Sequence, residues 1–413
     1  MEKFVIGGGT PLFGDVFVSG SKNAALPLLF ATIVTGGTSE IGNLPDISDI
    51  RVTLSILSAM GAKVSYLTKN RIRISTDTLT GAEPPPALTS QIRASTYLLG
   101  AMLARFGRAR IGGYGGCDFS ARPIDMHIAA ARAFGAVSDG GTLVAAHLTG
   151  GEITFPTVSV GATVNALFLA AAATGESEIR NAAIEPHILA LADFLRAAGA
   201  KIEFSGRTIR VTGAALHAVD AEVIPDMIEA GTYLLAAPIT GGRIRVHGAP
   251  IRELSALTDA LTLAGVEIKE KDGVLSAEGA PVRPIPIVTA PHPGFATDLQ
   301  PPIAPLLAVG AGGSIREEVF CGRFGYLSEL ARFGLGFSVR GNTADIFPSH
   351  LHAATAHATD LRGGAAAVLT ALSAKGKSEV LGAEKVLRGY EGFAGKLIAL
   401  GAKIRLVRQP EGE

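Results

Sequence analysis

A cysteine beside a run of glycines is the residue of this chain best suited to chemistry. Cys117 follows four glycines between positions 112 and 116, and Arg122, Pro123 and Asp125 come shortly after it. The glycines predict a loop, and Pro123 with Asp125 predicts the start of the next helix. An exposed thiol before a helix N-terminus and near an arginine is favoured as the reactive thiolate. We therefore expect Cys117 to donate a proton or attack a substrate, the alternative being a buried, inert cysteine.

Polar residues stand where several long apolar helices are predicted to begin. Lys22 and Asn23 hold this place in the first helix, and Arg93, Asp298 and Arg362 hold it in later ones. A helix N-terminus presents unpaired N–H groups and the positive end of the helix dipole, which bind phosphate or carboxylate. Any one of these residues alone would be interpreted as a solvated surface charge. Their recurrence predicts a site for an anionic, phosphate-bearing substrate.

Other candidate groups carry weaker signals. Cys321 is predicted to be a buried structural cysteine, whereas its neighbour Arg323 is a further candidate cation. Three histidines lie between positions 350 and 357, but no cysteine or carboxylate pattern completes a metal site around them. The early run Gly7–Gly9 is predicted to be a turn, and no complete phosphate-binding glycine motif is present. We therefore predict neither a metal nor a cofactor.

The composition is that of a globular protein without a charge bias. Lys plus Arg number 37 and Asp plus Glu also number 37, so no overall field would attract nucleic acid or a membrane surface. The apolar runs fall short of the roughly 20 residues that span a bilayer, and the sequence does not open with a secretory signal pattern. Two cysteines far apart fit a reducing compartment. We expect a cytoplasmic protein, with a monomer favoured and with no nucleic acid or membrane partner.

A repeated pattern predicts the elements that position these residues. A glycine, a small or apolar residue and then a strand recur at Gly61, Gly135, Gly199, Gly265, Gly334 and Gly401. Each follows a helical pattern, such as 184–198, so the glycine is interpreted as the left-handed residue that ends the helix. A hairpin pattern follows, as at 201–211. The even spacing of six copies favours a repeat over the alternative that these glycines are unrelated helix stop signals.

A second set of helices is rich in alanine and leucine and is apolar almost all round, which predicts burial. These helices are predicted at 23–34, 95–106, 163–173, 229–239, 300–309 and 363–374. The sequence therefore predicts an α/β fold of six repeated units, each with two helices packed on a small sheet. Three units would form each of two domains, one containing residues 1–20 and 228–413 and the other 21–227.

The motifs that carry these candidates resemble those of the enolpyruvyl transferases, which belong to the EPSP synthase superfamily. The resemblance runs nearly end to end and rests on Ser19–Pro27, Arg93–Ser95, Gly115–Asp125, Val158–Thr163, Pro225–Asp226, Phe295–Gln300, Asp360–Arg362 and Leu387–Glu391. It implies a two-domain inside-out α/β barrel that closes over its substrates, with the active site in the cleft between the domains.

The resemblance also implies the reaction. The 3′-hydroxyl of UDP-N-acetylglucosamine would attack C2 of phosphoenolpyruvate to give a tetrahedral ketal, and phosphate would then leave, which makes a peptidoglycan precursor. The catalytic residues implied are Cys117, Asp298, Lys22 and Arg388. Cys117 would protonate C3 or form an adduct with phosphoenolpyruvate, and Asp298 would take the hydroxyl proton.

Further residues are implied to bind the substrates. The cations that would hold phosphate and carboxylate are Lys22, Arg93, Arg122, Arg362 and Arg388, with Arg323 as an additional candidate. Asn23 would orient the sugar. The uridine and diphosphate would lie against Arg122, Pro123, Ile124, Asp125, Ser159, Val160 and Gly161.

Four positions depart from the family pattern. Ser48 and Thr157 replace lysines, Met227 stands where arginine is common, and Cys321 lies in a Phe-Cys-Gly-Arg-Phe segment where the family has Phe-Glu-Asn-Arg-Phe. Loss of one charge-assisted contact costs about 1.5 to 3 kcal/mol, which weakens binding without removing the chemistry. Two alternatives therefore stay open, an enolpyruvyl transferase for another nucleotide or sugar acceptor and a non-catalytic nucleotide-sugar sensor. Intact Cys117 and the arginine set speak against the sensor.

Overall fold

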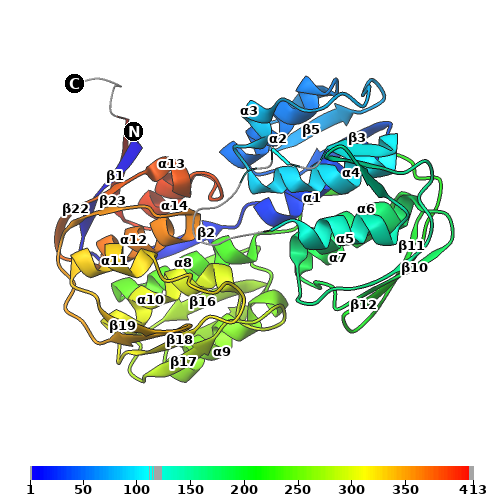
Figure 1. The fold of residues 1–413 in the computed structure, drawn as a ribbon. Helices are drawn as coiled ribbons and strands as arrows, with labels where there is room; N and C mark the ends of the chain where they lie inside the picture. Colours follow the sequence, from blue (N-terminus) through cyan, green and yellow to red (C-terminus); the bar gives the residue numbers. More distant parts are fainter. Residues whose placement is uncertain (1, 111, 114, 116–122, 409–413) are drawn as a thin grey trace. The chain divides into compact units, whose positions relative to one another are not determined.

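The computed structural model describes residues 2–110, 112–113, 115 and 123–408 (Figure 1). Cys117 and Arg122 therefore lie outside the described residues. The chain divides into two compact units. Unit 1 contains the segment up to Ser19 and the chain from Pro225 onward, and unit 2 contains the described chain from Gly20 to Ile224.

The boundaries between the units lie slightly earlier than the sequence suggests. Unit 2 ends at Ile224 rather than at position 227. The reason is the helix that follows, because Asp226 caps it by accepting hydrogen bonds from the N–H groups of Ile228 and Glu229 at 2.7 and 3.0 Å. The N–H of Asp226 also donates to the carbonyl of Ser19 at 2.9 Å. Residues 225–227 therefore belong with unit 1.

The strands of unit 1 form three four-stranded sheets. Their orders are β21 (Thr355–His357), β22 (Gly376–Leu381), β1 (Glu2–Gly8) and β23 (Lys403–Arg408); β15 (Glu267–Lys271), β16 (Val274–Glu278), β14 (Arg243–His247) and β2 (Phe13–Phe17); and β17 (Ile285–Val288), β18 (Gly313–Arg316), β20 (Thr343–Phe347) and β19 (Gly336–Arg340). One pair in each sheet is parallel and the others are antiparallel.

The described strands of unit 2 form two four-stranded sheets and one of three strands. Their orders are β11 (Lys201–Ser205), β12 (Thr208–Thr212), β10 (Glu176–Arg180) and β9 (Glu152–Thr154); β13 (Ala221–Glu222), β3 (Thr38–Gly42), β5 (Arg71–Ser75) and β4 (Lys63–Thr68); and β6 (Arg108–Arg110), β8 (Thr142–Val144) and β7 (Val137–Asp139). The hairpin predicted at 201–211 is confirmed as β11 and β12, which pair antiparallel.

Three nearly buried helices pack together in each unit. In unit 1 they are α8 (Met227–Thr240), α10 (Gln300–Val309) and α12 (Leu361–Ser373), which lie side by side in Figure 1. In unit 2 they are α1 (Lys22–Thr35), α4 (Leu98–Phe106) and α6 (Val160–Ala172). Short 3₁₀ turns, η1 (Arg93–Tyr97) and η3 (Thr297–Leu299), lead into α4 and α10. The six predicted apolar helices are thus confirmed, each within a few residues of its expected bounds.

The remaining helices bury one face or are short. They are α2 (Ser48–Ala59), α3 (Pro86–Thr89), α5 (Asp125–Ala133), α7 (Pro186–Ala197), α9 (Ser255–Ala264), α11 (Tyr326–Leu330), α13 (Ala383–Val386) and α14 (Phe393–Ala399), with 3₁₀ turns η2 (Arg252–Leu254) and η4 (Ala331–Phe333). On α7, Ile188, Leu191 and Leu195 are buried at helical spacing.

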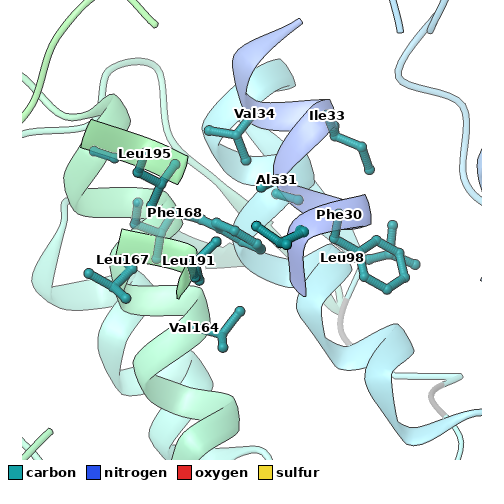
Figure 2. Close-up of a cluster of buried hydrophobic side chains, with 14 of the residues drawn as sticks. Phe30, Ala31, Ile33, Val34, Leu98, Val164, Leu167, Phe168, Leu191 and Leu195 are labelled. Carbon is teal, nitrogen blue, oxygen red and sulfur yellow. The ribbon is translucent and has the colours of Figure 1, made fainter. Parts of the chain in front are cut away.

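The core of unit 2 shows how α1 is held. Twelve of its 14 residues are buried, and Figure 2 shows Phe30 and Ala31 of α1 with Leu98 of α4 and Phe168 of α6 in one apolar cluster. All four side chains are at most 2% exposed. Truncating a buried phenylalanine to alanine costs about 3 to 5 kcal/mol, so this cluster fixes the helix ends that carry the candidate residues.

Glycines act at the predicted helix ends. All six repeat glycines have φ between 89° and 121°, a region that side-chain-bearing residues rarely adopt. The turn predicted at Gly7–Gly9 is wrong for its first two residues, because Gly7 and Gly8 belong to β1. A side chain at Gly8 would collide with the carbonyl oxygens of Ala371 and Ala374, so glycine allows β1 to pass close to the end of α12.

Candidate active site

A carboxylate between two arginines forms the candidate site of unit 1. Asp298 Oδ1 accepts hydrogen bonds from Nη1 and Nη2 of Arg323, both at 3.0 Å, and Oδ2 accepts from Nε and Nη2 of Arg362, both at 3.1 Å. The arginine side chains are 3% and 2% exposed, whereas the Asp298 side chain is 29% exposed. The carboxylate is therefore fixed by buried guanidinium groups and remains open to solvent.

The starts of the three central helices of unit 1 place these groups. Asp298 lies in η3, just before α10, and Arg362 is the second residue of α12. Asp360 caps α12, because its Oδ1 accepts from the N–H groups of Arg362 and Gly363 at 2.8 and 3.1 Å. Asp226 caps α8 in the same way. A carboxylate at a helix N-terminus is stabilised by the helix dipole, so the local sequence sets the geometry.

Electrostatics keep Arg362 charged. Burial by itself lowers the pKa of Arg362, but Tyr390 and the carboxylates of Asp298 and Asp226 outweigh it and hold this pKa above its ordinary value. The Arg362 guanidinium lies 5.1 Å from the centre of the Tyr390 ring, a cation–π geometry. Two guanidinium partners favour the ionised form of Asp298. An ionised, partly open carboxylate of this kind can accept a proton from a hydroxyl group.

A second buried charge pair lies where the chain passes between the units. Glu229 of α8 accepts from Lys396 Nζ at 2.6 Å and from the N–H of Ser19 at 2.7 Å, and Lys396 also donates to Ser19 Oγ at 2.7 Å. Burial raises the pKa of Glu229 to about 7, against the lowering effect of Lys396. This network ties α8 and α14 to the end of the N-terminal segment.

In unit 2, a lysine and an arginine lie near helix starts as expected. Lys22 is the first residue of α1, and its Nζ lies 3.5 Å from the buried carboxylate of Asp49. Asn23 follows it. Arg93 begins η1, its Nη1 donates to the carbonyl of Gly115 at 3.5 Å, and burial lowers its pKa below the ordinary value. The cation at Arg93 is thus anchored to the segment that leads toward Cys117.

A neutral network joins η1 and the first turns of α4, α5 and α6. Asn165 Nδ2 donates to the carbonyls of Thr96 and Gly161 at 3.1 and 3.2 Å and lies 2.7 Å from His127 Nδ1. Its Oδ1 accepts from the N–H of Gly100 at 2.5 Å. Burial, helped by the charge of Arg93, lowers the pKa of His127 to about 4, so the imidazole is neutral near pH 7.

Several expected nucleotide-binding residues of unit 2 lie at the starts of α5 and α6, two of the helices that this network joins. Ser159 caps α6 by accepting from the N–H of Ala162 at 3.3 Å, and Val160 and Gly161 form the first turn. Asp125 begins α5, directly after Pro123 and Ile124. Gly161 has to be small, because a side chain there would press on the His127 ring. The structure therefore brings Arg93, Asp125 and the start of α6 together.

Some expected residues lie elsewhere. Arg388 is half-buried in the turn between α13 and α14. Cys117 and Arg122 are outside the part of the chain that the structure describes. The prediction that Cys321 is buried is wrong, because this residue is exposed. It lies in a turn whose preceding N–H groups, those of Val319 and Phe320, donate to Glu317 Oε1.

Sequence reasoning missed the residues that hold the candidates in place. Asn165, His127 and Glu317 have no place in the motifs, although each is at most 5% exposed. The available signals were an amide in the middle of an apolar helix and an acidic residue directly after strand β18. Buried polar groups of this kind nearly always have partners.

No group of three or more histidine, cysteine or acidic side chains among the described residues has the proximity to bind a metal. No helix in the described chain combines the length and the apolar character needed to cross a bilayer.

Comparisons with known proteins match nearly the whole chain. The family model of EPSP synthase (3-phosphoshikimate 1-carboxyvinyltransferase) matches residues 6–397. The UDP-N-acetylglucosamine 1-carboxyvinyltransferase of Trichlorobacter lovleyi is 43% identical, over 99% of this chain and 100% of its own length. UDP-N-acetylglucosamine 1-carboxyvinyltransferase 3 of Caldanaerobacter subterraneus subsp. tengcongensis is also 43% identical, with the same coverage.

Solved structures show the same architecture. The enolpyruvyl transferase NikO from Streptomyces tendae superposes with a TM-score of 0.89 at 28% identity, covering 99% of both chains. EPSP synthase from Acinetobacter baumannii gives a TM-score of 0.73 at 17% identity, over 99% of this chain and 100% of the other. The second likeness shows the α/β fold alone.

Proposed function

This chain belongs to the EPSP synthase family, and from that membership we propose that it transfers the enolpyruvyl group of phosphoenolpyruvate to the 3′-hydroxyl of UDP-N-acetylglucosamine. The observation that carries this proposal is the full-length, 43% identity to carboxyvinyltransferases named for that acceptor. The carboxylate of Asp298, ionised and partly exposed between two arginines, supports it chemically.

The proposed reaction is an addition followed by an elimination. Asp298 accepts the proton of the 3′-hydroxyl as the sugar oxygen bonds to C2 of phosphoenolpyruvate, and Cys117 delivers a proton to C3, which gives the tetrahedral ketal. In the second step, the C–O bond to phosphate breaks and a proton leaves C3, which restores the double bond as an enol ether. Inorganic phosphate is the second product.

The remaining residues bind and orient the substrates in this proposal. Cations hold phosphate and carboxylate because negative charge moves during both steps; these are Lys22, Arg93, Arg122, Arg323, Arg362 and Arg388. Asn23 orients the sugar. The uridine and diphosphate lie against Pro123, Ile124, Asp125, Ser159, Val160 and Gly161. In this proposal the two units act as the domains of an inside-out α/β barrel built from six repeats, three in each unit.

The test is phosphate release from phosphoenolpyruvate. We expect release when UDP-N-acetylglucosamine is added and none with phosphoenolpyruvate alone. A mass spectrum should show the acceptor heavier by one enolpyruvyl group. If phosphate is released only with a different acceptor, the proposed substrate is wrong.

A second candidate is the same chemistry on another nucleotide or sugar acceptor. The observation that favours it is the loss of two family lysines at Ser48 and Thr157. Ser48 begins α2, and Thr157 is exposed, with its hydroxyl 3.8 Å from Met126 Sδ. If these losses reflect a different acceptor, a Ser48→Lys, Thr157→Lys variant should have a lower KM for UDP-N-acetylglucosamine, because it restores two contacts that the wild type lacks. If the KM does not change, the residues at positions 48 and 157 give no support for a different acceptor.

The role of Cys117 has its own matched control. Cys117→Ser should slow turnover by about 10² to 10⁴-fold and remove sensitivity to an epoxide phosphonate such as fosfomycin. Cys321→Ser should do neither, because Cys321 is an exposed residue of a turn in unit 1. Equal loss in the two variants would contradict the assignment.

A further inference from the structure

A fully buried carboxylate, that of Glu317, is linked to Asp298 through two other side chains. Glu317 directly follows β18 and is 0% exposed. Its Oε1 accepts from the Thr289 hydroxyl and from the N–H groups of Val319 and Phe320, all at 2.9 Å, and its Oε2 accepts from the Thr297 hydroxyl at 3.0 Å. Among the described residues, no cation within ion-pair distance of it is recorded. A carboxyl group buried without a paired cation is costly and persists only where donors satisfy its oxygens.

Glu317 fixes the direction of a hydrogen-bond chain. The Thr297 hydroxyl donates to Glu317 Oε2, so its single hydrogen is used in that bond. The lone pairs of that hydroxyl are then left to accept from Arg323 Nη1, which lies 2.9 Å away. The same Nη1 also donates to Asp298. The order of the chain is therefore Glu317, Thr297, Arg323 and Asp298.

Glu317 also holds the backbone that carries Arg323. Its Oε1 binds the N–H groups of Val319 and Phe320, which open the turn, and the N–H of Arg323 donates to the carbonyl of Phe320 at 3.3 Å. Both the side chain and the backbone of Arg323 thus depend on one buried carboxylate. Cys321, one of the positions that differ from the family pattern, lies in this turn. The carboxylate that holds the turn belongs to Glu317, which precedes the turn in the chain.

We propose that Glu317 is a positioning residue, which orients Arg323 against Asp298 through the Thr297 hydroxyl and the backbone of the 319–323 turn. The inference rests on the proposed function in that Asp298 is the proton acceptor of the reaction. Glu317 acts on that reaction only through Arg323 and does not touch the reacting atoms.

The replacement Glu317→Gln breaks the chain while keeping the size of the side chain. If the amide nitrogen takes the place of Oε2, it donates to the Thr297 oxygen and competes with Arg323. If it takes the place of Oε1, it faces three other donors, those of Thr289, Val319 and Phe320. Neither orientation keeps all the hydrogen bonds, because the amide has only one accepting oxygen.

The charged and titratable groups around Asp298 define the readout. Arg323 faces it from the 319–323 turn and Arg362 from α12, with Tyr390 and Asp226 acting on Arg362 from behind. Glu317→Gln disturbs only the Arg323 contact directly. A carboxylate that loses part of a cationic partner holds its proton more tightly, so protonation of Asp298 should occur at higher pH in this variant.

The experiment follows Asp298 by ¹³C NMR titration of aspartate carboxyl carbons, with the signal assigned through Asp298→Asn. In Glu317→Gln we expect the Asp298 titration and the acid limb of kcat/KM to move to higher pH. We expect kcat to fall about 10- to 100-fold, with the KM for phosphoenolpyruvate changed less than about threefold. Thr289→Val is the matched control, because it removes a hydroxyl that donates to Oε1 and accepts from the N–H of Glu318, and it leaves the Oε2–Thr297–Arg323 chain in place.

The outcomes separate a positioning role from a purely structural one. If Glu317→Gln lowers stability but leaves the Asp298 titration and kcat unchanged, or if Thr289→Val moves them equally, the proposal is wrong. Should Glu317→Gln fail to fold, Thr297→Val must reproduce the shift and Thr297→Ser must not, and any other result overturns the proposal. Lack of phosphate release by the wild type would contradict the proposed function alone, because the NMR titration does not require turnover.

Discussion

In unit 1 the candidate carboxylate is held by buried charges, whereas in unit 2 a neutral amide and a neutral imidazole join η1, α5 and α6. Asp298 is bound by Arg323 and Arg362, while Asn165 and His127 join η1, α5 and α6 without an ion pair between them. Buried ion pairs give fixed orientation at a desolvation cost, and neutral networks give it only if every group is satisfied. The two units therefore reach similar order with different sensitivities to mutation and to pH.

Of the residues in the charged cluster, Asp298 should have the largest effect on activity when it is replaced. Asp298→Asn removes the proton acceptor and should lower kcat/KM about 10² to 10⁴-fold in the phosphate release assay. The surface carboxylate Asp345, which pairs with an arginine that is 85% exposed, offers a control. Asp345→Asn should leave kcat/KM unchanged, and a similar loss in both variants would mean that the effect is not local.

Removing one cation should cost stability as well as activity. Arg362→Met leaves Asp298 with one guanidinium partner, and the free energy of unfolding should fall by about 3 kcal/mol, the lower end for breaking a buried pair, since Asp298 is partly exposed. Urea denaturation measures this value. The exposed Arg340→Met should change it by less than about 1 kcal/mol. A small effect of Arg362→Met would show that the pair is not the stabilising element of unit 1.

Breaking the neutral network of unit 2 should affect stability and substrate binding more than kcat. Asn165→Ala leaves the N–H of Gly100 and the carbonyl of Thr96 without this partner, which should lower the free energy of unfolding by about 2 kcal/mol. Because the start of α6 loosens, the KM for UDP-N-acetylglucosamine should rise while kcat changes little. A fall in kcat with an unchanged KM would place this network with the chemistry instead of the nucleotide.

The smallest expected effects are on the pH dependence of stability, to which His127 and Glu229 contribute slopes of opposite sign. The pKa of His127 is lowered from 6.5 to about 4, so the folded protein binds fewer protons there and stability should rise with pH from about 4 to 6.5. The pKa of Glu229 is raised from 4.5 to about 7, so stability should fall as pH rises from about 4.5 to 7.

Variants at the two positions separate these slopes. His127→Asn should remove the rise and Glu229→Gln the fall, when the free energy of unfolding is measured in urea between pH 4.5 and 7.5. Parallel curves for wild type and both variants would contradict both assignments.

Local signals in the sequence predicted the helices and strands but not the buried polar residues that hold them together. The helix-ending glycines, such as Gly199 and Gly265, act within a few residues of themselves, and their positive φ angles follow from the sequence pattern. Asn165 instead depends on Gly100, which is 65 residues away, and Glu317 depends on Thr289. Such partners are set by tertiary packing, which no local pattern encodes.

The same limit explains the wrong predictions. Cys321 was expected to be buried because most lone cysteines are, but it is exposed, in a turn whose N–H groups donate to the buried Glu317. Gly7 and Gly8 read as a turn, yet their place in β1 depends on pairing with β22 and β23. Residues whose role is set by neighbours in the chain were predicted, and those set by distant contacts were not.

The pairing of β1 has a consequence for synthesis on the ribosome. β1 lies between β22 and β23, so Glu2 pairs with Arg408 and Lys3 with Leu381. This sheet cannot be completed until residue 408 has been translated, whereas the described chain of unit 2 emerges earlier. β1 therefore gains its second partner strand only late in synthesis, after the chain of unit 2 has emerged.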